Sequence, residues 1–557
     1  MAIPLLWLFI LLGLLSGSSL ADTSSFYSHR RSFSYSLPTT YADPSPYQGL
    51  AFGSNNVTVP LRTQRDLALN VTIDHWLWPT LNMNTAYFGN DYSTQKLTNV
   101  QQVMAMGYRR LVLDLYWDAG RHQWQLCPAA TMNDNNYYTC ATSENSFRQF
   151  MQQVDDYMVS TNVSAAPSDT DLLFLVFNLH PLQSSSSNNN NAVTSRQQQQ
   201  GDSLSDTIID IIGTERLYTP SKLEQDRRNG TVGHDSWPTW LNLISDRVQL
   251  LVGLGSNELG NSSGYNTGVD LDMIFGENQL LEVTAVAASS NLSQSLSHCT
   301  TNNGSWATLI DRPSDPFVYN TTLKATYCGY SPYFTTSNYT SDISKNDNHS
   351  ITHLQDNVLG TIWSWDVGQP MASSNPHCTM IQRWNGRWRS GLCTELLRVA
   401  CRHKDDPNKW VLTATYVSYD RAFSACPDNY VFDVPRVAVQ NKQLFQVLQA
   451  DLLENGPHDE GINNPLHHLF WINLNTGSNG ACWVVGLYST CWWLREEGAA
   501  FANLIRTSAV AGVIILILVG IFTWVKCARS WRARKARSRK SFIKELLARR
   551  EYVTVPA

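Results

Sequence analysis

The chain has 557 residues, of which 43% are hydrophobic, 11% aromatic and 16% charged, with a formal net charge of −5 at pH 7. So many aromatic side chains allow a sizeable core, which excludes a disordered stalk, and the length favours two domains. Residues 526–557 hold 11 Lys or Arg and two Glu. The remaining part of the chain, 1–525, which we call the body, therefore has 30 basic and 44 acidic residues, a net charge of −14. Such an acidic body is unsuited to binding nucleic acid.

The first segment, 1–21, is an apolar run that ends in the small residues Ser19 and Ala21. This pattern predicts a secretory signal peptide cleaved after Ala21, with an uncleaved membrane anchor as the alternative. Residues 22–67 are rich in Ser, Tyr and Pro without periodicity, so we expect an irregular lead-in.

Residues 68–370 alternate between apolar strand-like runs and helical or loop segments. In KLTNVQQVMAMGYRRLVLDLYWD, 96–118, an amphipathic helix ends at Gly107 and a buried strand follows. Similar apolar runs predict strands at 171–180, 247–255 and 360–368. Continuous apolar runs indicate parallel strands covered on both faces, and hence an α/β barrel or doubly wound sheet. The polar stretch 184–203 is expected to be a solvated loop inserted in this domain.

Residues 371–495 are dense in cysteine and tryptophan and predict a small disulfide-rich module, or alternatively a cysteine-stapled spacer. Ten cysteines precede residue 508, and an even number in an oxidising compartment predicts five disulfides whose pairing the sequence leaves open. The candidates are Cys127, Cys140, Cys299, Cys328, Cys378, Cys393, Cys401, Cys426, Cys482 and Cys491.

Residues 508–525 carry no charge and approach the ~20 residues that a helix needs to cross a bilayer. The basic segment 526–557 follows directly, which predicts a single-pass type I membrane protein with a luminal or extracellular amino-terminal part and a cytoplasmic tail. Cys527 is either a palmitoylation site or an ordinary cysteine beside the membrane. Which membrane would house the protein is left open.

Ten Asn-x-Ser/Thr acceptors lie before this segment and none after it, which predicts a glycoprotein. The predicted glycosylation sites are Asn56, Asn70, Asn162, Asn229, Asn261, Asn291, Asn303, Asn320, Asn338 and Asn348.

The order of WPTLNMNTAY at 78–87 and then QQVMAMGYRRLVLDLYWD resembles the first two strands of the phosphatidylinositol phospholipase C-like barrel. The resemblance implies a TIM-barrel-like α/β domain over 68–370. It also places Leu81 where that superfamily has its first catalytic histidine and Asn82 where it has an asparagine beside a metal. A leucine cannot transfer a proton. The second histidine could only be His180, and Asp114 would be the acidic residue that ends the second strand.

We therefore predict an inactive barrel with Asn82, Asp114 and His180 as a vestigial site, and no catalytic residue, metal ligand or cofactor. The alternative is a phosphodiesterase or a glycoside hydrolase acting on glycolipid or cell-wall glycan, in which Asp114 works with a second carboxylate. Candidates for that second carboxylate are Asp118, Glu258 and Asp366.

The cysteine-rich part is similar to pieces of the C-type lectin fold, particularly WNGRWRSGLCTELLRVAC at 384–401. The acidic triplets with which that family binds calcium and sugar are absent. Lectin-like packing is thus expected rather than lectin activity, and a carbohydrate-binding receptor is a third hypothesis.

Nearly end to end, the order of these parts and the segments VPRVAVQN, FWIN and ACWV resemble the fungal maintenance of telomere capping protein 6 family. The resemblance implies a membrane glycoprotein linked to telomere capping and supplies no catalytic residues. Because the acidic body cannot contact telomeric DNA, we expect an indirect effect, through protein partners of the body or the basic tail, and no direct nucleic-acid binding.

Overall fold

The computed structural model describes the parts of the chain given by the ranges 55–127, 129–132, 138–140, 146–162, 167–182, 203–260, 263–285, 291–297, 299, 304–336, 354–371, 377–455, 465–476, 482–487 and 489–550. The predicted signal peptide, the lead-in up to residue 54 and the loop insertion up to residue 202 lie outside the described residues. Residues 42–557 form one compact unit.

Parallel strands of the larger sheet follow the order β9, β10, β11, β1, β2, β6, β8, β7, with β3 antiparallel to β2 and β4 antiparallel to β5. The strands are β1 (Thr80–Asn82), β2 (Arg110–Asp118), β3 (Gln123–Gln125), β4 (Ala129–Met132), β5 (Tyr138–Cys140), β6 (Leu173–Leu182), β7 (Leu217–Tyr218), β8 (Leu250–Asn257), β9 (Glu282–Ala285), β10 (Ala307–Ile310) and β11 (Ser331–Phe334). Parallel strands separated by helices are the arrangement of a TIM-barrel-like α/β fold, which confirms that part of the predicted fold class.

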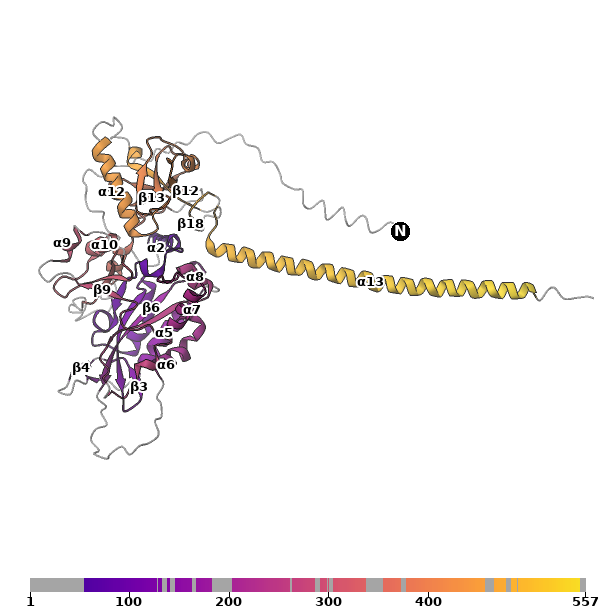
Figure 1. Cartoon of the computed structure of the whole chain (residues 1–557), viewed down its shortest axis with the longest axis horizontal. Helices are drawn as coiled ribbons and strands as arrows, with labels where there is room; N and C mark the ends of the chain where they lie inside the picture. The colour runs from indigo at the N-terminus through magenta and orange to yellow at the C-terminus, as the bar shows by residue number, and fades with distance from the viewer. Residues whose placement is uncertain are drawn as a thin grey trace, which may run out of the picture. The chain divides into compact units, whose positions relative to one another are not determined.

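Helices connect these strands and cover the outer face of the sheet, as α5, α6, α7 and α8 do beside β6 (Figure 1). The α-helices are α2 (Asn55–Leu67), α3 (Thr94–Thr98), α4 (Val100–Ala105), α5 (Ser146–Ser160), α6 (Leu204–Ile212), α7 (Pro220–Arg228), α8 (Trp240–Ser245), α9 (Leu292–Ser297) and α10 (Tyr319–Tyr327). Short helical turns lie at Ile73–His75, Met83–Phe88, Pro167–Asp169, Thr214–Arg216, Thr267–Val269 and Leu359–Thr361.

The continuous apolar runs of β2 and β6 have a structural reason. The two strands pair in parallel over their whole length, from Arg110 opposite Phe174 to Asp118 opposite Leu182. One face of the pair packs against helices in the largest hydrophobic core, and the other face closes the barrel interior with a smaller apolar cluster. A strand buried on both faces must be apolar along its length, so the few polar residues that face the interior stand out.

A second sheet holds β13, β12, β17, β14 and β15 in that order, with β16 beside β14 and β18 beside β17. All its pairs are antiparallel except β14 with β17. Its elements are β12 (His377–Gln382), β13 (Trp388–Leu392), β14 (Arg398–His403), β15 (Trp410–Leu412), a helical turn (Tyr419–Ser424), β16 (Tyr430–Phe432), α12 (Ala438–Asn455), a helical turn (Pro465–His468), β17 (Leu469–Thr476) and β18 (Trp483–Val484). The similarity of this part to the C-type lectin fold stays a prediction.

The described disulfides each join one cysteine to the next cysteine along the chain. They confirm the predicted disulfide bonding for these pairs. These pairs are Cys299–Cys328, Cys378–Cys393, Cys401–Cys426 and Cys482–Cys491. Cys127 is also disulfide-bonded. The side chain of Cys140 lies outside the described part of the chain, and Cys527 is a free, exposed thiol.

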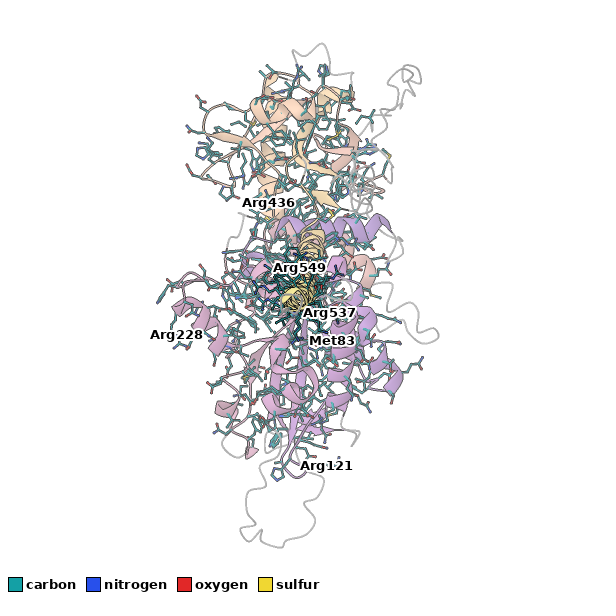
Figure 2. All side chains as sticks on the ribbon, turned by 90° about the vertical axis from the view of Figure 1, so that its right-hand side faces the viewer. Met83, Arg121, Arg228, Arg436, Arg537 and Arg549 are labelled. Carbon is teal, nitrogen blue, oxygen red and sulfur yellow. A yellow bond between two sulfur atoms is a disulfide. The ribbon has the colours of Figure 1, made fainter. Side chains whose placement is uncertain are left out.

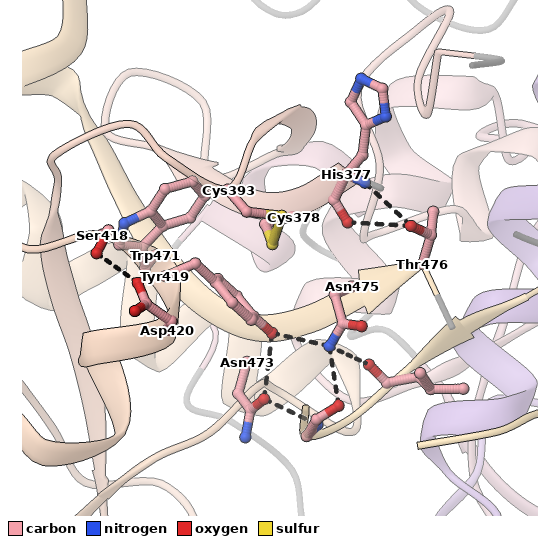
Figure 3. The surroundings of a disulfide bond; sticks show 12 residues. His377, Cys378, Cys393, Ser418, Tyr419, Asp420, Trp471, Asn473, Asn475 and Thr476 are labelled. Carbon is pink, nitrogen blue, oxygen red and sulfur yellow. Dashed lines mark hydrogen bonds between the residues drawn. A yellow bond between two sulfur atoms is a disulfide. The ribbon is translucent and has the colours of Figure 1, made fainter. Parts of the chain in front are cut away.

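Asn473 and Asn475 of the FWINLN segment make hydrogen bonds inside the second sheet, near the Cys378–Cys393 disulfide (Figure 3). The Tyr419 hydroxyl donates to Asn473 Oδ1 at 3.3 Å and accepts from Asn475 Nδ2 at 3.2 Å. Asn473 Nδ2 donates to the Phe432 carbonyl at 3.0 Å. Both amides are buried, so they satisfy backbone and side-chain groups of the sheet and are not presented to a sugar.

Helix α13 (Trp492–Arg550) contains the segment 508–525, which the sequence predicts to cross a membrane. In the described part of the chain, no helix is both long and apolar enough for a bilayer span. This finding contradicts the transmembrane helix in the predicted fold class and the predicted single-pass membrane localisation.

Candidate functional site

Polar side chains gather at the carboxyl ends of β1, β2, β6 and β8, where TIM-barrel enzymes hold their sites. Alternate residues of β2 face opposite sides, and Leu113 packs in the outer core while Val112 packs with Val176 and Tyr333 inside the barrel. The side chain of Asp114 therefore faces the interior, above an apolar floor. We call Asn82, Asn84, Asp114, Asn178, His180 and Glu258 the strand-end cluster.

Asp114 is held by two asparagines. Asn178, its parallel-strand neighbour on β6, donates from Nδ2 to Asp114 Oδ1 at 2.8 Å. Asn84 Oδ1 accepts the backbone N–H of Asp114 at 2.7 Å. The Asp114 side chain remains 23% exposed, so the carboxylate is fixed in position and still reachable by a ligand.

His180 lies between two carboxylates. Its Nδ1 is 2.7 Å from Glu258 Oε2, directly after β8, and its Nε2 is 3.8 Å from Asp114 Oδ1. The ring also stacks on Tyr116, with 5.2 Å between ring centroids. Burial by itself would lower the pKa of His180, but hydrogen bonding and charge from Asp114 and Glu258 outweigh it and raise the pKa above its ordinary 6.5. The imidazolium form is thus favoured.

Glycine at position 255 makes room for this arrangement. A Cβ added to Gly255 would lie 2.3 Å from Asn178 Oδ1, closer than any real contact allows. The same oxygen accepts the Ser256 backbone N–H at 3.0 Å. Gly255, the last residue of the RVQLLVGLG run, therefore leaves space for the side-chain amide of Asn178, which orients Asp114.

The first strand supplies asparagines and no titratable side chain. Leu81 is fully buried in the outer core, so it faces away from the cluster, and its neighbour Asn82 faces the interior. Asn82 Nδ2 lies 3.4 Å from the Tyr333 hydroxyl, and its Oδ1 accepts the Thr85 N–H at 3.0 Å. Asn82 thereby caps the six-residue π-helix that starts at Met83, labelled in Figure 2, and that carries Asn84 towards Asp114.

The predicted vestigial residues are thus brought together only in part. His180 and Asp114 are in contact distance, and Asn82 lies at the edge of the cluster, linked to Tyr333. Asn84 and Asn178 were missed by sequence reasoning. Asn178 could have been found, because it lies two residues before His180 and alternation places both on one face.

The other two candidate carboxylates, those of Asp118 and Asp366, make hydrogen bonds away from the strand-end cluster. Asp118 accepts the backbone N–H groups of Gly120 and Arg121 at 2.9 and 3.2 Å, in a turn whose tip carries Arg121 (Figure 2). Asp366 accepts from Gln382 Nε2 at 2.8 Å, in the second sheet. Of the three carboxylates considered as partners of Asp114, only Glu258 belongs to the strand-end cluster.

Metal binding finds no support in the described ranges, where no group of three or more His, Cys, Asp or Glu side chains could hold an ion. Among the predicted glycosylation sites, Asn70, Asn229, Asn291 and Asn320 are exposed. Asn162 is half-buried, and the side chain of Asn56 is not described. Asn261, Asn303, Asn338 and Asn348 lie outside the described residues, and glycosylation stays a prediction.

Residues 52–353 match the family described as the MTC6 partial TIM-barrel domain. The chain is 23% identical over 520 residues to "Maintenance of telomere capping protein 6" of Komagataella phaffii, covering 84% of this chain and 90% of the relative. It is 25% identical over 531 residues to the protein of the same name in Meyerozyma guilliermondii, covering 84% and 89%.

A solved structure of a mutant phosphatidylinositol-specific phospholipase C from Staphylococcus aureus is similar at 10% identity, covering 54% of this chain and 97% of that one. The TM-score is 0.27, which is too low to support an argument about this chain. The family assignment of this chain rests on the match over residues 52–353, which is more than half of its length.

Proposed function

The chain belongs to the maintenance of telomere capping protein 6 family, and we propose that it serves telomere capping as a non-catalytic protein whose barrel binds a neutral, polyhydroxylated ligand at the strand-end cluster. The observation that carries the proposal is the position of His180 between the carboxylates of Glu258 and Asp114.

The chemistry of the cluster suits hydroxyl groups. Carboxylates accept hydrogen bonds from hydroxyls, and the amides of Asn82, Asn84 and Asn178 can both donate and accept. A sugar or cyclitol presents neighbouring hydroxyl groups, each of which can pair with both hydrogen-bond donors and acceptors. Glu258, whose side chain is 45% exposed, and Asp114 leave the carboxylates open to such a ligand.

Charge decides between a neutral ligand and a phosphate. Asp114 and Glu258 bring two negative charges against the single positive charge of the His180 imidazolium, so the cluster is net negative. An anionic phosphodiester would be repelled at this distance, whereas an uncharged polyol would not. This favours a sugar or cyclitol over a phosphate ester.

Non-catalytic status is supported by the arrangement of the titratable groups. Acid–base cleavage of a phosphodiester needs two proton-transfer groups on opposite sides of the substrate, and β1 offers only asparagine. A glycoside hydrolase needs two carboxyl groups that face the sugar on either side of the scissile bond, whereas Asp114 and Glu258 both face the His180 ring. A barrel that holds its ligand without cleaving it fits both observations.

The test is isothermal titration of the full-length chain with mannose, glucose and myo-inositol, each compared with its monophosphate. We expect at least one neutral compound to bind, its phosphate to bind more weakly, and Asp114→Asn to weaken binding about tenfold, the effect of losing one charged hydrogen bond. Glu277→Gln, which changes an exposed carboxylate outside the cluster, is the matched control.

Turnover is measured in parallel with chromogenic glycosides and phosphodiesters. Hydrolysis that His180→Gln abolishes would overturn the non-catalytic assignment. Binding of none of the neutral compounds, or preference for the phosphates, would overturn the ligand class.

A further inference from the structure

A pocket lies at the amino ends of the parallel strands, opposite the strand-end cluster. This pocket has a volume of about 330 Å³. Its lining includes Trp78 and Pro79 just before β1, Arg109 just before β2 and Asp171 just before β6. Ligand sites in proteins measure about 300–1,000 Å³, so the pocket can take a small molecule. We call it the strand-start pocket.

The walls of the strand-start pocket are largely apolar. Trp76 and Trp78 stack with 5.3 Å between centroids and an interplanar angle of 15°, and both line the cavity. Leu61 of α2, Leu77 and Trp363 add to the same lining. Such aromatic and aliphatic walls favour an apolar ligand body, because its burial removes apolar surface from water.

Arginines form the polar side of the pocket. The lining holds four of them, Arg62, Arg65, Arg109 and Arg436, together with Asp169 and Asp171. Each guanidinium is paired with a carboxylate, namely that of Asp169, Asp66, Asp171 and Asp433 respectively. An anionic group on the ligand would therefore be held by the remaining guanidinium N–H donors and not by an excess of positive charge.

Arg62 and Arg436 are the arginines best able to reach a ligand. Arg62 binds Asp169 through Nη2 at 2.5 Å, and Arg436 binds Asp433 through Nη2 at 2.9 Å. Their side chains are 25% and 31% exposed. A guanidinium has five N–H donors, so each keeps donors for a carboxylate or phosphate.

We propose that the strand-start pocket binds an amphipathic small molecule whose apolar body packs against Trp76 and Trp78 and whose single carboxylate or phosphate head is held by Arg62 and Arg436. The apolar walls argue against a fully polar ligand, and the guanidinium N–H donors argue against a cationic amphiphile, whose head group has no acceptor for them. The proposal is independent of the polyol site, because the two sites lie at opposite ends of the strands.

The experiment titrates the full-length chain with decanoate, decyl phosphate, decanol and decyltrimethylammonium below their micelle concentrations. Decanoate or decyl phosphate is expected to bind about tenfold more tightly than decanol, and the cation more weakly than decanol. The stronger of the two anions identifies the head group.

Variants separate head-group recognition from apolar burial. Arg62→Gln combined with Arg436→Gln should lower anion affinity about tenfold, to the level of decanol, and leave decanol binding unchanged. Arg148→Gln is the matched control, because Arg148 pairs with Asp210 at 2.8 Å and does not line the pocket. Leu61→Trp, which fills the cavity, should abolish binding of all the decyl compounds while the melting temperature stays within a few degrees.

Equal affinity for anion and alcohol, or an anion affinity untouched by the double variant, would overturn the head-group assignment. Absence of binding, or binding that persists in Leu61→Trp, would overturn the pocket. Asp114→Asn should leave decanoate binding unchanged, so failure of the polyol proposal and failure of this one are told apart.

Discussion

His180 shows how a single residue can acquire a charge state from its position in the barrel. In the sequence it is one histidine at the end of an apolar run, predicted only as part of a vestigial site. In the fold, parallel pairing brings Asp114 alongside, and the turn after β8 brings Glu258 to the other ring nitrogen. Neither partner is within 60 residues of His180 along the chain.

Replacing Glu258 by Gln should reveal this charge state. The pKa of His180 is higher in the folded state than its value of 6.5 in the unfolded chain. The free energy that the charged His180 contributes to folding is therefore fully present below pH 6.5 and is lost as pH rises through the folded-state pKa. We expect Glu258→Gln to lower the free energy of unfolding by about 1 kcal/mol below pH 6.5 and to have less effect above the folded-state pKa.

Urea unfolding between pH 5.5 and 8.5 measures the free energy of unfolding, and NMR titration of the His180 ring measures its folded-state pKa. Glu277→Gln serves again as the control with an exposed carboxylate. A loss of stability that is the same at every pH would show that Glu258 acts by packing and not through the imidazolium.

Among the elements, the second sheet is built from short strands, several of only two or three residues, that cannot bury a large core alone. Tryptophans fill much of its interior, including Trp365, Trp388 and Trp471, which are completely buried. Three disulfides tie its loops together. Cross-links and large aromatic side chains replace the broad apolar faces that stabilise the barrel.

Removing the Cys401–Cys426 disulfide should destabilise this sheet more than the barrel. The bond joins residues 25 apart, from β14 to the segment after the Tyr419–Ser424 turn, and closing a loop of that length contributes about 3 kcal/mol. We expect the double variant Cys401→Ala and Cys426→Ala to lower unfolding free energy by about that amount.

Differential scanning calorimetry and tryptophan fluorescence report the transition. The double variant of Cys299 and Cys328, whose loop has a similar length but belongs to the barrel, is the comparison. An unchanged melting temperature after loss of Cys401–Cys426 would mean that packing alone holds the second sheet.

At the scale of the whole molecule, buried polar contacts join the barrel to the second sheet. Arg387, next to β13, is completely buried and donates from Nη2 to the hydroxyl of Tyr319 on α10 at 3.2 Å. Its Nη1 donates to the carbonyls of Ile362 and Trp365. The guanidinium therefore holds a helix of the barrel and the segment that leads into the second sheet in one network.

Substituting Arg387 by Met should uncouple the two sheets. The variant keeps an apolar stem of similar length but strips donors from buried oxygens, each costing about 1–3 kcal/mol when left unpaired. We expect the single thermal transition to broaden or split in two. The measurement is calorimetry, with the exposed Arg148→Gln as control, and one sharp transition at a lower temperature would indicate general destabilisation without uncoupling.

Much of the fold could be read from the chain. Continuous apolar runs at 171–180 and 247–255 became β6 and β8, and the helix, Gly107 and strand sequence at 96–118 became α3, α4 and β2. These elements depend on local periodicity, which a sequence displays directly. The disulfide pairing was left open by the sequence, and the structure joins successive cysteines in each described pair.

The transmembrane assignment shows the opposite case. Hydropathy over 508–525 favoured a span, but no helix in the described part of the chain is long and apolar enough to cross a bilayer. Sequence reasoning also missed Asn84 and Asn178, which reach Asp114 through the helix after β1 and through the register of β6 with β2. A one-residue shift along a strand reverses the face of every side chain, and composition does not reveal it.

The sequence by itself determined a parallel α/β sheet from its periodicity and the presence of disulfides from its cysteine content, and its resemblance to known families supplied the barrel and the family. Only the tertiary structure decided which polar residues meet: the enclosure of His180 by Asp114 and Glu258, and the arginine-rimmed pocket at the other ends of the strands. The physical reason is that these contacts join side chains far apart in the chain, and their chemistry arises from the order and register of the strands.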